Sequence, residues 1–287
     1  MLGHDNTRLD IQERKKMKLE STIVKAYIDR KSVDIFSENW YFLKEGYCYQ
    51  EPSYDKEHIE AVSRIYSQIR EIVENFIPCN LNIWEAIFPE WKRIIGEVTI
   101  NLIVGFPEPN DATVLKAPDG CNHVILDLGL WVKYEGKCNM RSVIHNLLTH
   151  ELCHICIGET VNGIDEDTKS ECYLTNLDAN TFHEGFAHLV SFEDKNIDSI
   201  DWKEERWNKV KEATGRKMQE ALKATDKQEQ EKYLYDAVYG NYFDKFACMS
   251  GMLYLVECWQ KNGIQGLKTV FEEGYAGFSA KAVKPID

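Results

Sequence analysis

Apolar residues recur every three or four positions over 57–77, which is the spacing of one buried face of an α-helix. The members of this set are Ile59, Val62, Ile65, Ile69, Ile72, Val73 and Phe76. Pro78 ends the pattern, because proline seldom continues a helix. A further helical stretch is predicted over 82–95, with an interruption near Pro89. The residues before 57 show no clean period, and there we expect one helix near 11–29, followed by an irregular segment across the active-site face.

The hydrophobic period then changes from helical to extended. Two short runs, 98–104 and 123–128, are rich in β-branched residues and predict strands, and the Pro and Gly residues between them predict turns. The C-terminal third is again helical, and the predicted helices cover 202–224, 233–260 and 264–273. This order of elements predicts a helix-rich α+β fold with a small sheet.

The segment His150-Glu151-Leu152-Cys153-His154 follows the second predicted strand. On a helix, residues four apart lie about 40° apart around the axis, so both imidazoles can reach one metal ion. Glu151 lies about 100° from His150, close enough to accept a proton from a water on that ion. Apolar residues on most sides make this a core helix, in which buried polar side chains need partners. The pattern therefore predicts a zinc site with Glu151 as general base.

A catalytic zinc ion usually has a third protein ligand. The metzincin extension is excluded, because Ile157 and Thr160 stand where it requires glycine and histidine. The acids Glu159, Asp165, Glu166 and Asp167 lie in a stretch that is typical of a solvated loop. Glu184 is the better candidate.

Glu184 lies in an apolar helix that we expect to begin near Asn180 or Thr181. Gly185 and Ala187 beside it allow another helix to approach closely, and a Glu at such a contact needs a partner. His183 and His188 remain rival or supporting residues: His183 points about 100° away from Glu184, whereas His188 shares its face. His145 lies about 180° around the helix from His154 and cannot join the same site.

His150-Glu151-x-x-His154 followed by Glu184-Gly185-x-Ala187 resembles the gluzincin metallopeptidases, especially the peptidase MA-like group. The resemblance implies that His150, His154 and Glu184 bind one Zn²⁺ per chain. It also implies a zincin-like fold with a twisted, mostly antiparallel sheet packed on the metal-binding helix. In that family the edge strand of the sheet pairs with the substrate backbone, and 123–128 is the candidate here.

The resemblance extends to the oxyanion donor and to the organisation of the chain. By analogy with the family, Tyr239 is the predicted donor, with Tyr235 second. The expected regions are a mainly helical one over 1–95, a catalytic one over 96–195 and a helical one over 196–287 that completes the cleft.

Composition narrows the function further. The 287 residues have a formal net charge of −13, which argues against binding nucleic acid or an anionic membrane through a broad basic surface. The first twenty residues have no apolar signal core, no run is long enough to span a membrane, and the nine cysteines show no repeated spacing. We therefore expect a cytoplasmic protein with reduced thiols that acts on a peptide or protein substrate.

Two other functions remain open. The same residues would serve a zinc hydrolase of a non-peptide amide or ester, because substrate specificity lies in pockets that a sequence does not display. A non-catalytic zinc-binding protein is the third possibility, although Glu151 argues against it, since a structural zinc site needs no base.

Overall fold

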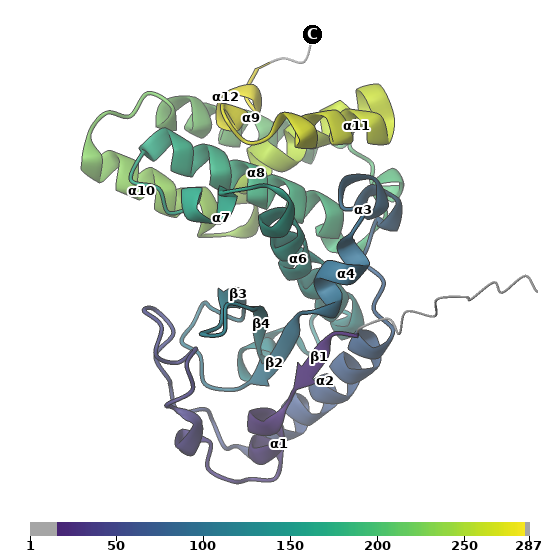
Figure 1. Ribbon diagram of the computed structural model, residues 1–287, viewed down its shortest axis with the longest axis vertical. Coiled ribbons are helices and arrows are strands. Elements are labelled where there is room, and N and C mark those ends of the chain that lie inside the picture. The colour runs from purple at the N-terminus through teal and green to yellow at the C-terminus, as the bar shows by residue number, and fades with distance from the viewer. Residues whose placement is uncertain (1–15, 285–287) are drawn as a thin grey trace, which may run out of the picture.

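The computed structural model describes residues 16–284 and shows a helix-rich α+β fold with one small sheet (Figure 1). The strands are β1 (Lys18–Glu20), β2 (Thr99–Ile103), β3 (Ala112–Lys116) and β4 (Asn122–Asp127). The first helices are α1 (Thr22–Ile28), α2 (Lys56–Glu74), α3 (Leu81–Ile87), α4 (Trp91–Gly96), α5 (Leu128–Trp131) and α6 (Met140–Thr160). The later helices are α7 (Ile164–Asp167), α8 (Tyr173–Ser191), α9 (Glu205–Ala221), α10 (Lys227–Val238), α11 (Phe246–Glu273) and α12 (Phe278–Lys281).

The sheet has the strand order β1-β2-β4-β3 and is mostly parallel. β1 pairs with β2 and β2 with β4 in parallel, whereas β3 pairs with β4 in antiparallel orientation. The prediction of a mostly antiparallel sheet was therefore wrong. The sequence contained a hint, because residues 102–104 and 124–126 are consecutive apolar residues, and both faces of such strands are buried, as is typical of parallel sheets.

The run over 123–128 forms β4, but β4 is an internal strand and not the predicted edge. The edge on this side is β3, which the sequence analysis did not identify. Every residue of β3 is at least partly exposed, so the strand shows no alternation of buried and exposed positions. Its place in the sheet depends on pairing with β4, which a local pattern does not reveal.

Several helices lie where the pattern predicts them. α2 corresponds to the helix that was predicted over 57–77, and α3 and α4 correspond to the interrupted stretch over 82–95. The helix near 11–29 is shorter than expected: residues 11–15 lie outside the described part of the chain, 18–20 form β1, and only 22–28 are helical.

The boundaries of two later helices were also wrong. α8 begins at Tyr173, not near Asn180, because Asn180 and Thr181 bond back to carbonyls four residues earlier instead of capping the helix. The predicted run over 233–260 is broken between Val238 and Phe246. The predicted last helix is instead the end of α11, which contains non-helical backbone at Gly263 (φ 60°, ψ −151°).

α6 connects the two halves of the molecule. It contacts α2, α4 and β3 on the sheet side and α8 on the other, and Figure 1 shows it between the sheet and the C-terminal helices. One hydrophobic cluster joins the sheet side to the C-terminal helices, and its members include Ile65 of α2, Val124 of β4, Leu152 of α6, Phe186 of α8 and Leu255 of α11. The division at residues 95 and 195 stays a prediction. Within 16–284, no helix is long and apolar enough to cross a membrane.

Candidate metal centre

The metal-binding motif lies in the middle of α6, as predicted. Asn139 caps the helix, since its side chain accepts hydrogen bonds from the backbone N–H groups of Arg141 and Ser142. The imidazoles of His150 and His154 lie one turn apart, and their Nε2 atoms are 3.0 Å from each other. Two nitrogens that converge in this way suit a shared cation, because imidazole nitrogen is a common zinc ligand.

Glu184 reaches the same point from α8. One of its carboxylate oxygens lies 3.5 Å from His154 Nε2 and the other lies 3.7 Å from His150 Nε2. α8 can come this close to its neighbours because Gly185 packs against Gly251 of α11, where a Cβ on Gly185 would lie 2.9 Å from backbone. The predicted close approach beside Glu184 is thus confirmed, and its partner is α11.

These distances fit a zinc ion. Ligands at about 2.0–2.1 Å from a tetrahedral ion lie about 3.3 Å from one another, and the three observed separations range from 3.0 to 3.7 Å. Three lone-pair donors in one buried place otherwise lack a common partner. The residues present therefore fit a bound zinc.

The electrostatics of the three side chains agree with this fit. Burial, and then the other imidazoles, holds the pKa of His150 well below its usual value, and burial lowers the pKa of His154 to about 4. Burial alone would raise the pKa of Glu184, but the nearby His154, His188 and His150 outweigh it and keep the carboxyl ionised. Neutral imidazoles and a carboxylate are the protonation states that bind a metal.

Glu151 lies beside this cluster and is only 7% exposed. Burial, followed by the charges of Glu184 and Asp111, raises the pKa of Glu151 to about 8. Its carboxyl group makes no hydrogen bond within residues 16–284, and without a cation these surroundings favour its protonated form near neutral pH. A cation bound next to it would favour the ionised form, which is the form a general base needs.

His188, which the sequence left as a rival or supporting residue, lies directly beside Glu184. Its Nε2 is 3.4 Å from Glu184 Oε2, and together with His150 these residues form a group that can hold a metal. This nitrogen is buried and makes no hydrogen bond in the described part of the chain, whereas Nδ1 lies 3.3 Å from the Tyr242 hydroxyl. The signal in the sequence was the i, i+4 spacing from Glu184.

The other ring nitrogen of His154, Nδ1, also has a partner. His154 Nδ1 lies 2.8 Å from His183 Nδ1, and His183 Nε2 lies 3.2 Å from Asp165 Oδ1. Asp165 belongs to α7 and can reach His183 only because residue 158 is glycine: a Cβ on Gly158 would lie 2.5 Å from the Asp165 carboxylate. Asp165 is thus not part of an unstructured loop, and it supports a candidate ligand through His183.

The neighbouring acids are anchored as well. Glu159 is at the end of α6 and accepts a hydrogen bond from Asn122, and Asp167 accepts one from the Tyr275 hydroxyl. The predicted solvation of this stretch is confirmed, because Glu159, Asp165 and Glu166 are exposed. The predicted loop was wrong, since residue 159 lies in α6 and residues 164–167 form α7.

The predicted oxyanion donors are exposed. Tyr239 is 46% and Tyr235 is 62% exposed. The ring of Tyr235, in the last turn of α10, stacks at 4.9 Å on that of Tyr239, which follows the helix. Burial, with a contribution from Glu184, raises the pKa of Tyr239, so its hydroxyl stays protonated and able to donate. Lys245, which the sequence analysis missed, is close enough to lower the pKa of Glu151.

Comparisons with known proteins bear on this centre. No curated protein and no solved structure matches the chain. One family model matches residues 5–277, a span that includes both helices of the metal centre, and its description is "Putative zinc dependent peptidase (DUF5700)". Since this match covers almost the whole sequence, the chain belongs to the DUF5700 family.

Proposed function

We propose that the protein is a metallopeptidase of the gluzincin type with one catalytic zinc held by His150, His154 and Glu184. The observation that carries this proposal is the convergence of three donor atoms from two helices, at 3.0–3.7 Å from one another. They lie beside the buried carboxyl of Glu151, which makes no hydrogen bond within residues 16–284. The zinc-dependent peptidase family supports the proposal, and so does the order of the motifs along the chain.

Bound zinc would supply an activated water and polarise the carbonyl of the bond that is cleaved. Glu151 is placed to act as the general base, and it would accept a proton from the attacking water and donate it to the departing amine. Tyr239 donates a hydrogen bond to the oxygen on which negative charge develops. Asp165 and His183 hold the His154 ring in one orientation, so that Nε2 faces the centre.

The substrate we propose is a peptide that pairs with β3. β3 is an edge strand, so one row of its backbone groups is free of strand partners, and it packs on α6, which carries the proposed ligands. This assignment replaces the 123–128 run, whose backbone groups are already paired on both sides.

Three variants test the proposal. The purified protein should hold zinc at His150, and His150→Ala or Glu184→Ala should lose it. Glu151→Gln should retain that zinc and lower the hydrolysis of a mixed peptide library by about 10²-fold or more, because the amide cannot accept a proton. Glu159→Gln is the matched control, since it changes an exposed acid on the same helix, and it should keep both zinc and activity. Full zinc retention in Glu184→Ala, or unchanged turnover in Glu151→Gln, would contradict the assignment.

The same assay separates peptidase activity from the hydrolysis of other substrates. A panel of non-peptide amides and esters is tested beside the peptide library. Hydrolysis of these amides or esters without cleavage of peptides would show that the protein is a zinc hydrolase of non-peptide substrates.

His188 supports a second candidate function, a zinc site without catalysis. If its buried Nε2 were a fourth protein ligand, no position would remain for water, as in structural zinc sites. His188→Ala distinguishes the two functions. If the site is catalytic, His188→Ala retains zinc. If His188 is a fourth ligand, His188→Ala binds zinc much more weakly, and neither the unmodified protein nor the variant hydrolyses peptides.

A further inference from the structure

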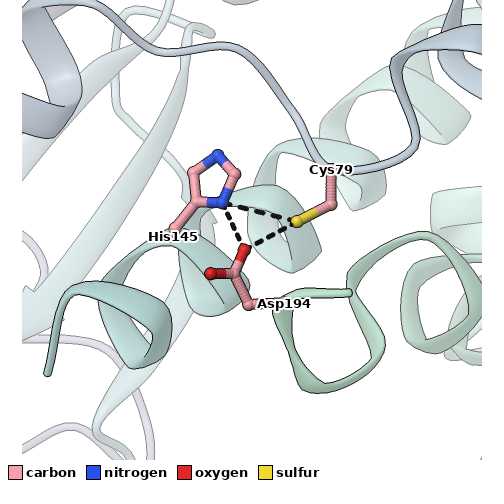
Figure 2. A group of neighbouring side chains, drawn as sticks. All are labelled: Cys79, His145 and Asp194. Carbon is pink, nitrogen blue, oxygen red and sulfur yellow. Dashed lines mark hydrogen bonds and ion pairs between the residues drawn. The ribbon is translucent and has the colours of Figure 1, made fainter. Parts of the chain in front are cut away.

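A second cluster of metal-binding side chains lies on the same helix as the proposed catalytic centre but outside it. His145 is five residues before His150 on α6, Cys79 precedes α3, and Asp194 follows α8. Figure 2 shows the three side chains pointing toward one another. Cys79 Sγ lies 2.8 Å from Asp194 Oδ1 and 3.4 Å from His145 Nδ1, and His145 Nδ1 also contacts Asp194 Oδ1.

The hydrogen bonds of the cluster show what a metal ion would replace. His145 Nε2 lies 2.6 Å from the carbonyl oxygen of Ile77, which can only accept, so Nε2 carries a proton. The hydrogen bond with Asp194 raises the pKa of His145 to about 10, so Nδ1 also carries a proton and donates it to Asp194. The Cys79 thiol donates to the same carboxylate oxygen. Two protons thus hold three potential metal ligands together, and a divalent cation can take the place of both.

The backbone on two sides of the cluster is held in an uncommon conformation. Asn80, Glu193 and Asp194 all have a positive φ, of 53°, 50° and 54°. Such a conformation is unfavourable for residues with a side chain and persists where the surroundings impose it, often at functional sites. Here it turns Cys79 and Asp194 toward His145.

Asn80 fixes these two segments to each other. Its side-chain amide donates to the carbonyls of Val190 and Lys195, and its oxygen accepts from the backbone N–H of Ile197. The turn that carries Asp194 is therefore bonded, on both sides of that residue, to the residue next to Cys79. The three donor groups are thus positioned before any ligand binds, which lowers the entropic cost of binding.

The cluster is also accessible. A surface pocket of about 590 Å³ is lined by Phe76, Arg141, His145 and Asp194, among other residues. Cys79 is 9% exposed and closes the inner side of the cluster. An ion can enter from the pocket, and three protein donors would leave its fourth position facing that space.

We propose that Cys79 Sγ, His145 Nδ1 and Asp194 Oδ1 form a second metal site, which binds Zn²⁺ or a similar thiophilic divalent cation. The separation of sulfur and nitrogen, 3.4 Å, is close to the separation of about 3.5 Å expected between two ligands of a tetrahedral zinc. Asp194 lies nearer to both partners than metal ligands do, so binding requires its carboxylate to move toward the pocket that it lines. The Cys79 thiol and His145 Nδ1 each lose one proton to solvent when the cation binds.

Cobalt titration of the full-length protein tests this site separately from the catalytic one. Co²⁺ replaces Zn²⁺ in such sites, and a cysteine ligand gives an intense near-ultraviolet charge-transfer band that imidazole and carboxylate ligands do not give. The metal-free protein should bind two equivalents of Co²⁺, one of them with this band. Cys79→Ser should bind one equivalent without the band.

Cys248→Ala is the matched control, because Cys248 is a buried thiol 3.6 Å from Glu184 and is the cysteine that a signal from the first centre would involve. This variant should keep the band. His150→Ala should also keep it, whether or not the protein proves to be a peptidase. No band in the unmodified protein, or a band that survives in Cys79→Ser and disappears in Cys248→Ala, would overturn the proposal and leave His145 and Asp194 as an ion pair.

Discussion

Replacement of Gly251 by alanine tests whether the contact between α8 and α11 positions Glu184. A Cβ at residue 251 would lie 2.5 Å from the carbonyl oxygen of Thr181 and 3.0 Å from the Cα of Gly185. Ordinary contacts begin at 3.4 Å, so the two helices would have to separate by about 0.9 Å. The groups in the way are backbone atoms, which cannot turn aside as a flexible side chain can.

The expected cost follows from two opposing effects. Overpacking of a core typically costs about 1–3 kcal/mol, and a clash with backbone belongs at the upper end of that range. The higher helix propensity of alanine than of glycine stabilises the folded state by about 1 kcal/mol and partly offsets this cost. The net loss in the free energy of unfolding is then about 2 kcal/mol, which lowers the melting temperature by about 4–8 °C. Since Glu184 lies next to the displaced contact, the zinc affinity should also fall by about 10- to 100-fold.

Gly215→Ala is the matched control for this experiment. Gly215 lies within α9, and the nearest atom to an added Cβ is a methyl group of Val283 at 4.0 Å. This variant should gain up to about 1 kcal/mol and keep its zinc affinity. Thermal melts and zinc titrations of both variants decide the matter. If Gly251→Ala were as stable as Gly215→Ala, or lost stability with unchanged zinc affinity, the close helix contact would not position the ligand.

Three further outcomes are expected. Asp165→Asn should weaken zinc binding by about 10- to 100-fold in a competition titration with unchanged circular dichroism, because His183 loses its carboxylate partner; unchanged affinity would remove Asp165 from the site. Asp127→Asn should lower the free energy of unfolding in urea by about 1–3 kcal/mol, because one Asp127 oxygen accepts from Gly105 and Phe106 and the other accepts from Leu130, whereas an amide has only one oxygen and its NH2 group would face an N–H donor; a neutral result would contradict this. A chelator should lower the melting temperature of the unmodified protein more than that of Glu184→Ala, since bound metal at 100-fold its Kd adds about 2.7 kcal/mol; equal shifts would place the stabilising metal elsewhere.

The convergence of His150 and His154 was predictable because it depends only on local geometry. His150, Glu151 and His154 lie on one helix, where the spacing alone determines that the imidazoles meet. Glu184 could be inferred from the small residues beside it, because a close helix contact has a signature in sequence. The helix α2 was predictable for a similar reason, since its apolar face repeats over five turns.

The remainder depends on contacts between distant segments. β3 becomes a strand by pairing with β4, and the parallel order of the sheet depends on how the long connections cross it. Cys79 and Asp194 are 115 positions apart and meet only because Asn80 bonds to the turn after α8. The link from Asp165 to His183 likewise requires two helices to be placed first. No periodicity along the chain encodes such pairings.

The fit between Gly158 and Asp165 has a consequence for how relatives of this protein can diverge. The Asp165 carboxylate occupies the space that a side chain at residue 158 would fill. A larger residue at 158 therefore displaces the acid from His183, and loss of the acid removes the reason for glycine within a helix. The two positions should therefore change together across the family. Sequences without glycine at 158 should also lack the acid at 165, and in them a residue other than Asp165 should hold the histidine at position 154 in place.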